Sequence, residues 1–139
     1  MSVQVPTAIV IATHGRFGEE LLASAELILG PMENVHTASL LPGEDPAGFA
    51  AKLDALEGVE KGGIILTDLF GGTPSNVAAA FASRHGHLVI SGVNLPLLVE
   101  VESFRDQLLE DPHVLEDVLA AGKDGIRNIS ALMAERKGS

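Results

Sequence analysis

The chain alternates between short apolar runs and longer segments in which apolar residues recur at helical spacing. The short runs are rich in branched residues, as strands covered on both faces should be. They predict strands at 7–12, 35–41, 62–68 and 87–91. The longer segments predict helices at 16–29, 45–58, 74–84, 95–104 and 114–137. This alternation predicts a mainly parallel sheet with helices on both faces, a three-layer α/β/α fold.

The 139 residues suit one domain, because 46% of them are hydrophobic and no repeat, low-complexity tract or linker interrupts the pattern. We expect a core over 7–104 and a C-terminal helical element over 114–137, weakened near Gly122 and Gly125. The polar stretch 106–113 is expected to be a loop between them. No apolar run reaches about 18 residues and no signal peptide is recognisable, so neither a membrane span nor export is predicted.

The charge and the residue composition limit which kinds of molecule the protein is expected to bind. The formal net charge of −10 argues against nucleic acid and against anionic membrane surfaces. It favours a protein partner with a basic face, mainly through faster association. The absence of cysteine excludes a disulfide framework and a thiol nucleophile, and it fits a cytoplasmic protein.

One stretch combines a strand end, a glycine turn and a helix start. Asp68 ends the predicted strand at 62–68. Gly71 and Gly72 then allow a tight turn and leave room for a ligand to approach the backbone. Thr73 is a good N-cap, and the proline that follows it suits the first helical position. The stretch therefore places a carboxylate beside a helix N-terminus, where free N–H groups attract anions.

His14 follows the first predicted strand, in a loop that Thr13 is expected to shape. With the flavodoxin-like strand order 2-1-3-4, the first and third strands are neighbours whose carboxyl ends meet at one edge. His14 and Asp68 would then lie close together, although 54 residues separate them. Two helix N-termini would converge there, so we predict a site for an anion, with phosphate as the obvious candidate. The hydroxyls of Thr73 and Ser75 are expected to cap the helix and to face the phosphate.

A histidine paired with a carboxylate is suited to phosphoryl transfer. Asp68 can accept a hydrogen bond from one ring nitrogen of His14, which fixes the tautomer and leaves the other nitrogen with a free lone pair. That nitrogen can attack a phosphoryl group in line. One histidine and one aspartate are too few ligands for a closed metal site, so we assign no metal, and no cofactor is expected. The remaining histidines lie away from the strand ends and are interpreted as structural or surface residues: His36, His85, His87 and His113.

Three motifs occur in register along the chain. They are Ala-Ile-Val-Ile-Ala-Thr-His-Gly at 8–15, Thr-Asp-Leu-Phe-Gly-Gly-Thr-Pro-Ser-Asn at 67–76 and Ser-Gly-Val-Asn-Leu-Pro-Leu-Leu-Val-Glu at 91–100. Together with Leu-Pro-Gly-Glu at 41–44, they resemble the enzyme IIA component of the mannose-class sugar phosphotransferase system. The resemblance covers about 7–104 and continues more weakly through 123–126.

The resemblance implies that His14 accepts a phosphoryl group from the phosphocarrier protein HPr and passes it to a IIB component, which phosphorylates an incoming sugar. Asp68 matches the aspartate that hydrogen-bonds this histidine. The resemblance also implies the strand order 2-1-3-4 and a homodimer made through a swapped antiparallel edge strand. Contact with the membrane would then be indirect, through the IIC and IID permease.

Other functions are compatible with parts of the pattern. A regulatory phosphocarrier, which controls a partner by its phosphorylation state without taking part in sugar transport, would look the same within the chain. A receiver module phosphorylated on Asp68 would need magnesium-binding acids where Thr13 and His14 stand. A histidine phosphatase would need an arginine in place of Thr13, and a flavin module would need a longer phosphate loop and an aromatic residue to stack on the flavin.

Overall fold

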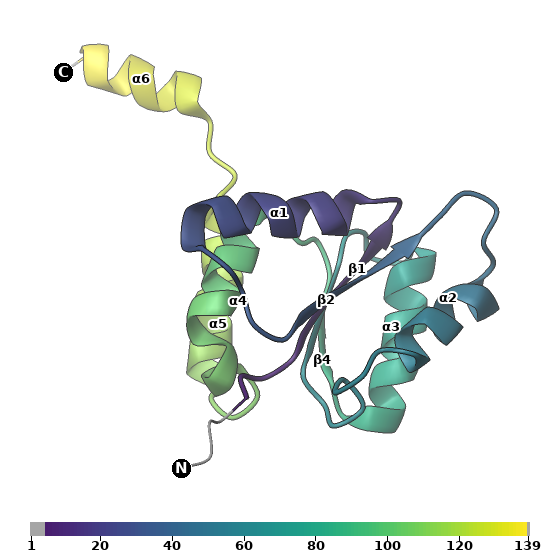
Figure 1. Ribbon diagram of the computed structural model, residues 1–139. Helices are drawn as coiled ribbons and strands as arrows, with labels where there is room; N and C mark the ends of the chain where they lie inside the picture. Colours follow the sequence, from purple (N-terminus) through teal and green to yellow (C-terminus); the bar gives the residue numbers. More distant parts are fainter. Residues whose placement is uncertain (1–4, 139) are drawn as a thin grey trace.

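The computed structural model describes residues 5–138, in which a four-stranded sheet lies between two layers of helices (Figure 1). The strands are β1 (Ile9–His14), β2 (Val35–Leu40), β3 (Ile64–Thr67) and β4 (Leu88–Ile90). All neighbouring strands pair in parallel, in the order β2-β1-β3-β4. The predicted fold class and strand order are therefore confirmed.

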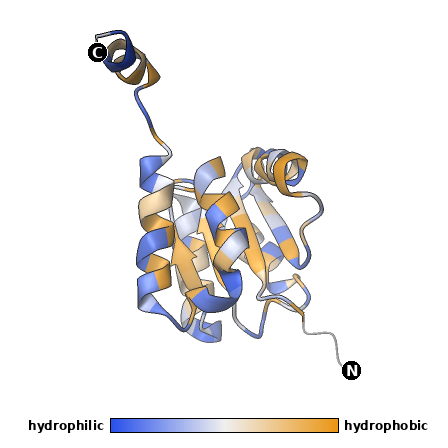
Figure 2. Ribbon diagram, turned by 90° about the vertical axis from the view of Figure 1, so that its left-hand side faces the viewer, coloured by the Kyte–Doolittle hydropathy of each residue, from blue (hydrophilic) through white to orange (hydrophobic). Residues whose placement is uncertain are grey.

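Helices cover both faces of the sheet, as parallel strands that are apolar throughout require. One face carries α1 (Phe17–Leu29), α4 (Leu95–Leu108) and α5 (Pro112–Asp124), and the other carries α2 (Pro46–Asp54) and α3 (Thr73–His85). Figure 2 shows mostly apolar strands between helices that mix apolar and polar residues.

The side chains of β1 show how the two halves of the core divide. Ile9 and Ile11 pack in a cluster with residues of α1 and α4, whereas Val10 and Ala12 pack in a cluster with residues of α2 and α3. Successive side chains of a strand point to opposite faces, so one apolar run supplies both halves.

The last helix, α6 (Ile129–Gly138), extends away from the sheet and its covering helices (Figures 1 and 2). None of its described residues is buried. Neither α6 nor any other helix within residues 5–138 is long and apolar enough to cross a membrane.

The loop expected at 106–113 is largely helical. Helix α4 continues to Leu108 through a kink at Phe104, whose backbone (φ −127°, ψ 15°) leaves the helical region. Asp111 then caps α5, because its side chain accepts a hydrogen bond from the backbone N–H of His113 at 2.9 Å. The polar residues that suggested a loop thus form a kinked helix end and a helix cap.

The continuous helix expected over 114–137 is interrupted near the predicted weak point. Helix α5 ends at Asp124, and on the capping residue Gly125 a Cβ atom would lie 2.5 Å from Cγ of Pro96. Asn128 then accepts a hydrogen bond from the N–H of Ala131 at 2.9 Å, at the start of α6. Within residues 5–138 no strand follows β4, so these residues do not form the antiparallel edge strand that the resemblance implies.

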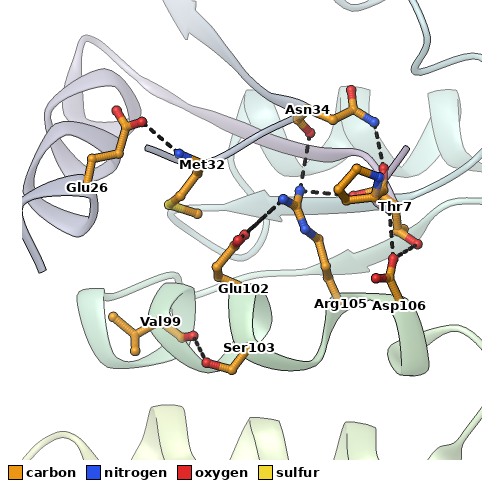
Figure 3. A network of polar contacts seen from close by, with 10 residues as sticks. Thr7, Glu26, Met32, Asn34, Val99, Glu102, Ser103, Arg105 and Asp106 are labelled. Carbon is orange, nitrogen blue, oxygen red and sulfur yellow. Dashed lines mark hydrogen bonds and ion pairs between the residues drawn. The ribbon is translucent and has the colours of Figure 1, made fainter. Parts of the chain in front are cut away.

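Arg105 ties α4 to the amino ends of β1 and β2 (Figure 3). Its side chain is 5% exposed, and it donates hydrogen bonds to the carbonyls of Thr7 at 3.1 Å and Asn34 at 3.5 Å. It also pairs with the carboxylate of Glu102 at 3.3 Å. Burial raises the pKa of Glu102, although the charge of Arg105 opposes that change. Asp106 accepts hydrogen bonds from the backbone N–H and the hydroxyl of Thr7, both at 2.9 Å, which lower the pKa of Asp106.

A second contact at the same end of the sheet involves His87, just before β4. The His87 ring lies 4.9 Å from the ring of Phe81 and 5.9 Å from that of His85, between centroids. Its Nε2 donates a hydrogen bond to the carbonyl of Val59 at 2.6 Å, while its Nδ1 is buried with no partner among the described residues. Burial lowers the pKa of His87.

Replacing Arg105 should destabilise the fold. Arg105→Ala would leave Glu102 without its counter-charge and would remove the hydrogen bond to the carbonyl of Thr7. We expect the free energy of unfolding to fall by about 2–3 kcal/mol, the value of hydrogen bonds to a charged group. Urea denaturation measures this change, and Arg127→Ala, at an exposed position, is the control. Equal losses in the two variants would show that the Arg105 contacts do not hold the strands.

Acid should weaken the fold through His87. Because its pKa is lower in the folded protein than the ordinary value of 6.5, the unfolded chain binds the proton first as the pH falls. The free energy of unfolding should therefore decrease as the pH falls below 6.5. Urea denaturation at pH 7 and at about pH 5 should show a larger decrease for the wild type than for His87→Gln, which does not titrate. A wild type that loses no more than the variant would contradict this account.

Candidate functional site

The carboxyl ends of β1 and β3 bring His14 and Asp68 together. Ala12 of β1 pairs with Thr67, the last residue of β3, so Asp68 follows at the same edge of the sheet as His14, the last residue of β1. One oxygen of Asp68, Oδ2, accepts a hydrogen bond from the backbone N–H of His14 at 2.9 Å and lies 3.0 Å from Nδ1 of its ring. The two residues that the sequence analysis placed side by side are thus in contact, and one carboxylate oxygen orients both the backbone and the ring.

This contact determines which ring nitrogen of His14 carries the proton when the ring is neutral. A carboxylate oxygen accepts hydrogen bonds, so the proton in the contact lies on Nδ1, and in the neutral ring Nε2 keeps its lone pair. The side chain of His14 is 46% exposed, against 15% for Asp68. The arrangement offers an oriented nitrogen nucleophile at the protein surface, backed by a negative charge.

The N-terminus of α3 packs against the same ring. A Cβ atom on Gly72 would lie 2.8 Å from Cε1 of His14 and 3.4 Å from Nε2, so only glycine fits here without moving the ring. Gly71 has φ +83°, a conformation that also favours glycine. The first turn of a helix has N–H groups without helical partners, so an anion on Nε2 would lie at the positive end of α3.

The cap of α3 differs from the prediction. Gly72 is the N-cap, with an extended backbone, and Thr73 and Pro74 are the first two helical residues. The N–H of Asn76 donates the first intrahelical bond to the carbonyl of Gly72 at 3.0 Å. The backbone that touches His14 therefore belongs to the cap itself, and Thr73 lies one residue inside the helix.

The hydroxyls of Thr13 and Ser75 are turned into the protein. Thr13 is fully buried, and its hydroxyl accepts a hydrogen bond from the N–H of Gly18 at 2.9 Å, within the first turn of α1. The hydroxyl of Ser75 donates to the carbonyl of Leu69 at 2.6 Å and lies 2.7 Å from the hydroxyl of Thr67. Both hydroxyls support the loops that carry His14 and Asp68. The role of Thr67 was not predicted, because the sequence does not show that a threonine at the end of a buried strand contacts a helix hydroxyl.

Apolar side chains are exposed on the loops around the pair. Leu69 and Phe70 directly follow Asp68, and they are 60% and 87% exposed. Phe17, at the start of α1, and Leu41, just after β2, are also exposed. Apolar residues exposed on neighbouring loops are typical of a surface that meets another protein. The signal in the sequence was two large apolar residues between Asp68 and the glycine turn.

Metal ligands do not gather in the described part of the chain. Within residues 5–138, no group of three or more histidine, aspartate or glutamate side chains is placed to hold a metal ion.

Comparison with known proteins places these features in a family. The family model described as PTS system fructose IIA component matches residues 8–118. The mannose-specific EIIAB component of the PTS system of Escherichia coli K12 is 40% identical over 136 residues, a match that covers 92% of this chain and 40% of that protein. This chain thus spans less than half the length of that relative. The fructose-specific EIIA component of Bacillus subtilis is 35% identical over 105 residues, which covers 73% of this chain and 72% of that protein.

Solved structures agree with these relatives. The phosphotransferase system component EIIA from Streptococcus agalactiae superposes with a TM-score of 0.80 at 31% sequence identity. The superposition covers 89% of this chain and 98% of that one. The range 8–118 that the family model matches includes both His14 and Asp68. The chain therefore belongs to the enzyme IIA family of the mannose class of the sugar phosphotransferase system.

Proposed function

We propose that the protein is a phosphocarrier that accepts a phosphoryl group from phospho-HPr on His14 and passes it to a IIB component, for sugar uptake and phosphorylation. The observation that carries the proposal is the contact of 3.0 Å between Asp68 Oδ2 and His14 Nδ1, next to the N-terminus of α3. The family supports the role as a component of a sugar phosphotransferase system. The names of the relatives, mannose-specific and fructose-specific, favour transport over the purely regulatory alternative.

The transfer needs only groups of the two proteins. The lone pair of His14 Nε2 attacks phosphorus, and the bond from phosphorus to the donor atom breaks, with its electron pair leaving on the donor. The Nδ1 proton stays in its hydrogen bond to Asp68, whose charge offsets the positive charge that develops on the ring. The first turn of α3, which begins at Thr73, supports the negative charge of the transferred group. The same steps in the opposite sense deliver the group to the IIB component.

The surroundings of the site support a protein as donor and acceptor. His14 is half exposed, and apolar side chains such as Phe70 stand beside it, where a docking protein could cover them. The net charge of −10 favours a partner with a basic face. We place this carrier in the cytoplasm, with the membrane reached only through the IIC and IID permease. The homodimer stays a prediction.

Phosphoryl acceptance tests the proposal directly. After incubation with enzyme I, HPr and phosphoenolpyruvate, the intact mass should rise by one phosphoryl group, and an acid-labile bond would identify phosphohistidine. His14→Ala should abolish the gain. Asp68→Ala should slow it roughly ten- to a hundredfold, which is the value of one charge-assisted hydrogen bond.

The control for this experiment is His113→Ala, because His113 is an exposed histidine on another element. It should gain mass as the wild type does. No gain in the wild type with active HPr from the same organism would exclude the phosphocarrier role. Unchanged rates in Asp68→Ala would remove Asp68 from the mechanism.

A methyl group at Gly72 should slow transfer without unfolding the protein. Gly72 has φ −81°, so alanine fits its backbone, but the new Cβ would lie 2.8 Å from Cε1 of His14 and displace the ring. We expect phosphoryl acceptance at least about tenfold slower, because small misplacements of a nucleophile are costly. Gly138→Ala adds the same methyl group in open space and should transfer at the rate of the wild type. Equal rates in Gly72→Ala and the wild type would show that the ring position does not limit transfer.

A further inference from the structure

Two buried hydroxyls lie beneath the loop between β3 and α3. Thr67, the last residue of β3, is fully buried, and Ser75, in the first turn of α3, is 8% exposed. Their oxygens are 2.7 Å apart, and the Ser75 hydroxyl donates to the carbonyl of Leu69 at 2.6 Å. Neither contact involves His14.

The direction of these bonds follows from the proton count. A carbonyl oxygen only accepts, and a serine hydroxyl has one proton, so the proton of Ser75 goes to Leu69. Thr67 must then donate its own proton to Ser75. The residues on both sides of Asp68 are therefore tied to the same oxygen, Thr67 through its side chain and Leu69 through its carbonyl.

Among the described residues, the carboxylate of Asp68 contacts only His14. Oδ2 makes the two contacts with His14, and Oδ1 is buried with no partner among the described residues. Its orientation therefore depends on the N–H of His14 in β1 and on where its own backbone places it. The carbonyl of Leu69 also accepts a hydrogen bond from the N–H of Gly72 at 3.3 Å, and Gly72 is the residue that packs against the His14 ring.

We propose that Thr67 and Ser75 are positioning residues that hold His14 in the tautomer with the proton on Nδ1 and the lone pair on Nε2. They act through Asp68 and Gly72 and do not touch the transferred group. Ser75 is thus a support of the loop and not a ligand of the phosphoryl group. The consequence for phosphoryl transfer rests on the proposed function, whereas the effect on the tautomer does not.

The test compares two readouts in Ser75→Ala. Nitrogen-15 NMR of the labelled imidazole reports which ring nitrogen of His14 carries the proton, and the rate of mass gain with phospho-HPr reports transfer. We expect a mixture of the two tautomers in the variant and transfer roughly tenfold slower, because a group on an unsupported loop loses its alignment. Ser83→Ala is the matched control, since Ser83 lies on the same helix, is exposed and donates to the carbonyl of Ala80 at 2.7 Å. It should leave both readouts unchanged.

A second pair of variants separates positioning from folding. Thr67→Val removes the hydroxyl from a buried position with little change of shape, and Thr67→Ser restores it. We expect Thr67→Val to shift the tautomer in the same direction as Ser75→Ala, and Thr67→Ser to behave as the wild type. The proposal is overturned if both Thr67→Val and Ser75→Ala keep a single Nδ1–H tautomer. If Ser75→Ala does not fold, a single Nδ1–H tautomer in Thr67→Val overturns it. A wild type that accepts no phosphoryl group would overturn the proposed function, and the tautomer would still decide whether these hydroxyls position His14.

Discussion

The contact between Asp68 and His14 depends on the parallel pairing of β1 with β3. Because the register joins Ala12 to Thr67, β3 ends beside the last residues of β1, and the carboxylate of Asp68 can meet His14. Any other neighbour for β1 on that side would leave the histidine without its carboxylate. The short strand–helix connections then bring the N-termini of α1 and α3 to the same edge, so one choice of strand order assembles the whole site.

The loops after β1 and β3 are each supported by a buried threonine, and the two threonines lie on opposite faces of the sheet. Thr13 faces α1, where it binds the N–H of Gly18, and Thr67 faces α3, where it meets Ser75. The alternation of side chains along strands permits this division. The backbone around His14 and Asp68 is therefore held by buried hydrogen bonds, while exposed apolar residues next to the pair, such as Phe70, can contact a partner.

The amino end of the sheet holds contacts that join its elements, whereas the carboxyl end holds the candidate site. At the amino ends, Arg105 and Asp106 join α4 to the backbone of Thr7, and His87 closes on the carbonyl of Val59. These contacts hold the strands in place far from the carboxyl edge. At the other end, the half-exposed His14 has a contact with Asp68 through Nδ1 alone, which leaves Nε2 open to a partner. Sites at the carboxyl ends of parallel strands commonly have this freedom.

The sequence by itself determined the fold class, the strand order through a resemblance, and the pairing of His14 with Asp68, because hydrophobic periodicity and strand-end motifs are local signals. It did not determine that α4 runs past Phe104 or that Gly72 is the cap of α3, because those boundaries depend on contacts between distant elements. It also could not show that the hydroxyl of Ser75 points inward. A serine in the first turn of a helix reads the same whether it faces solvent or a buried threonine, and only the packing of α3 on β3 decides between them.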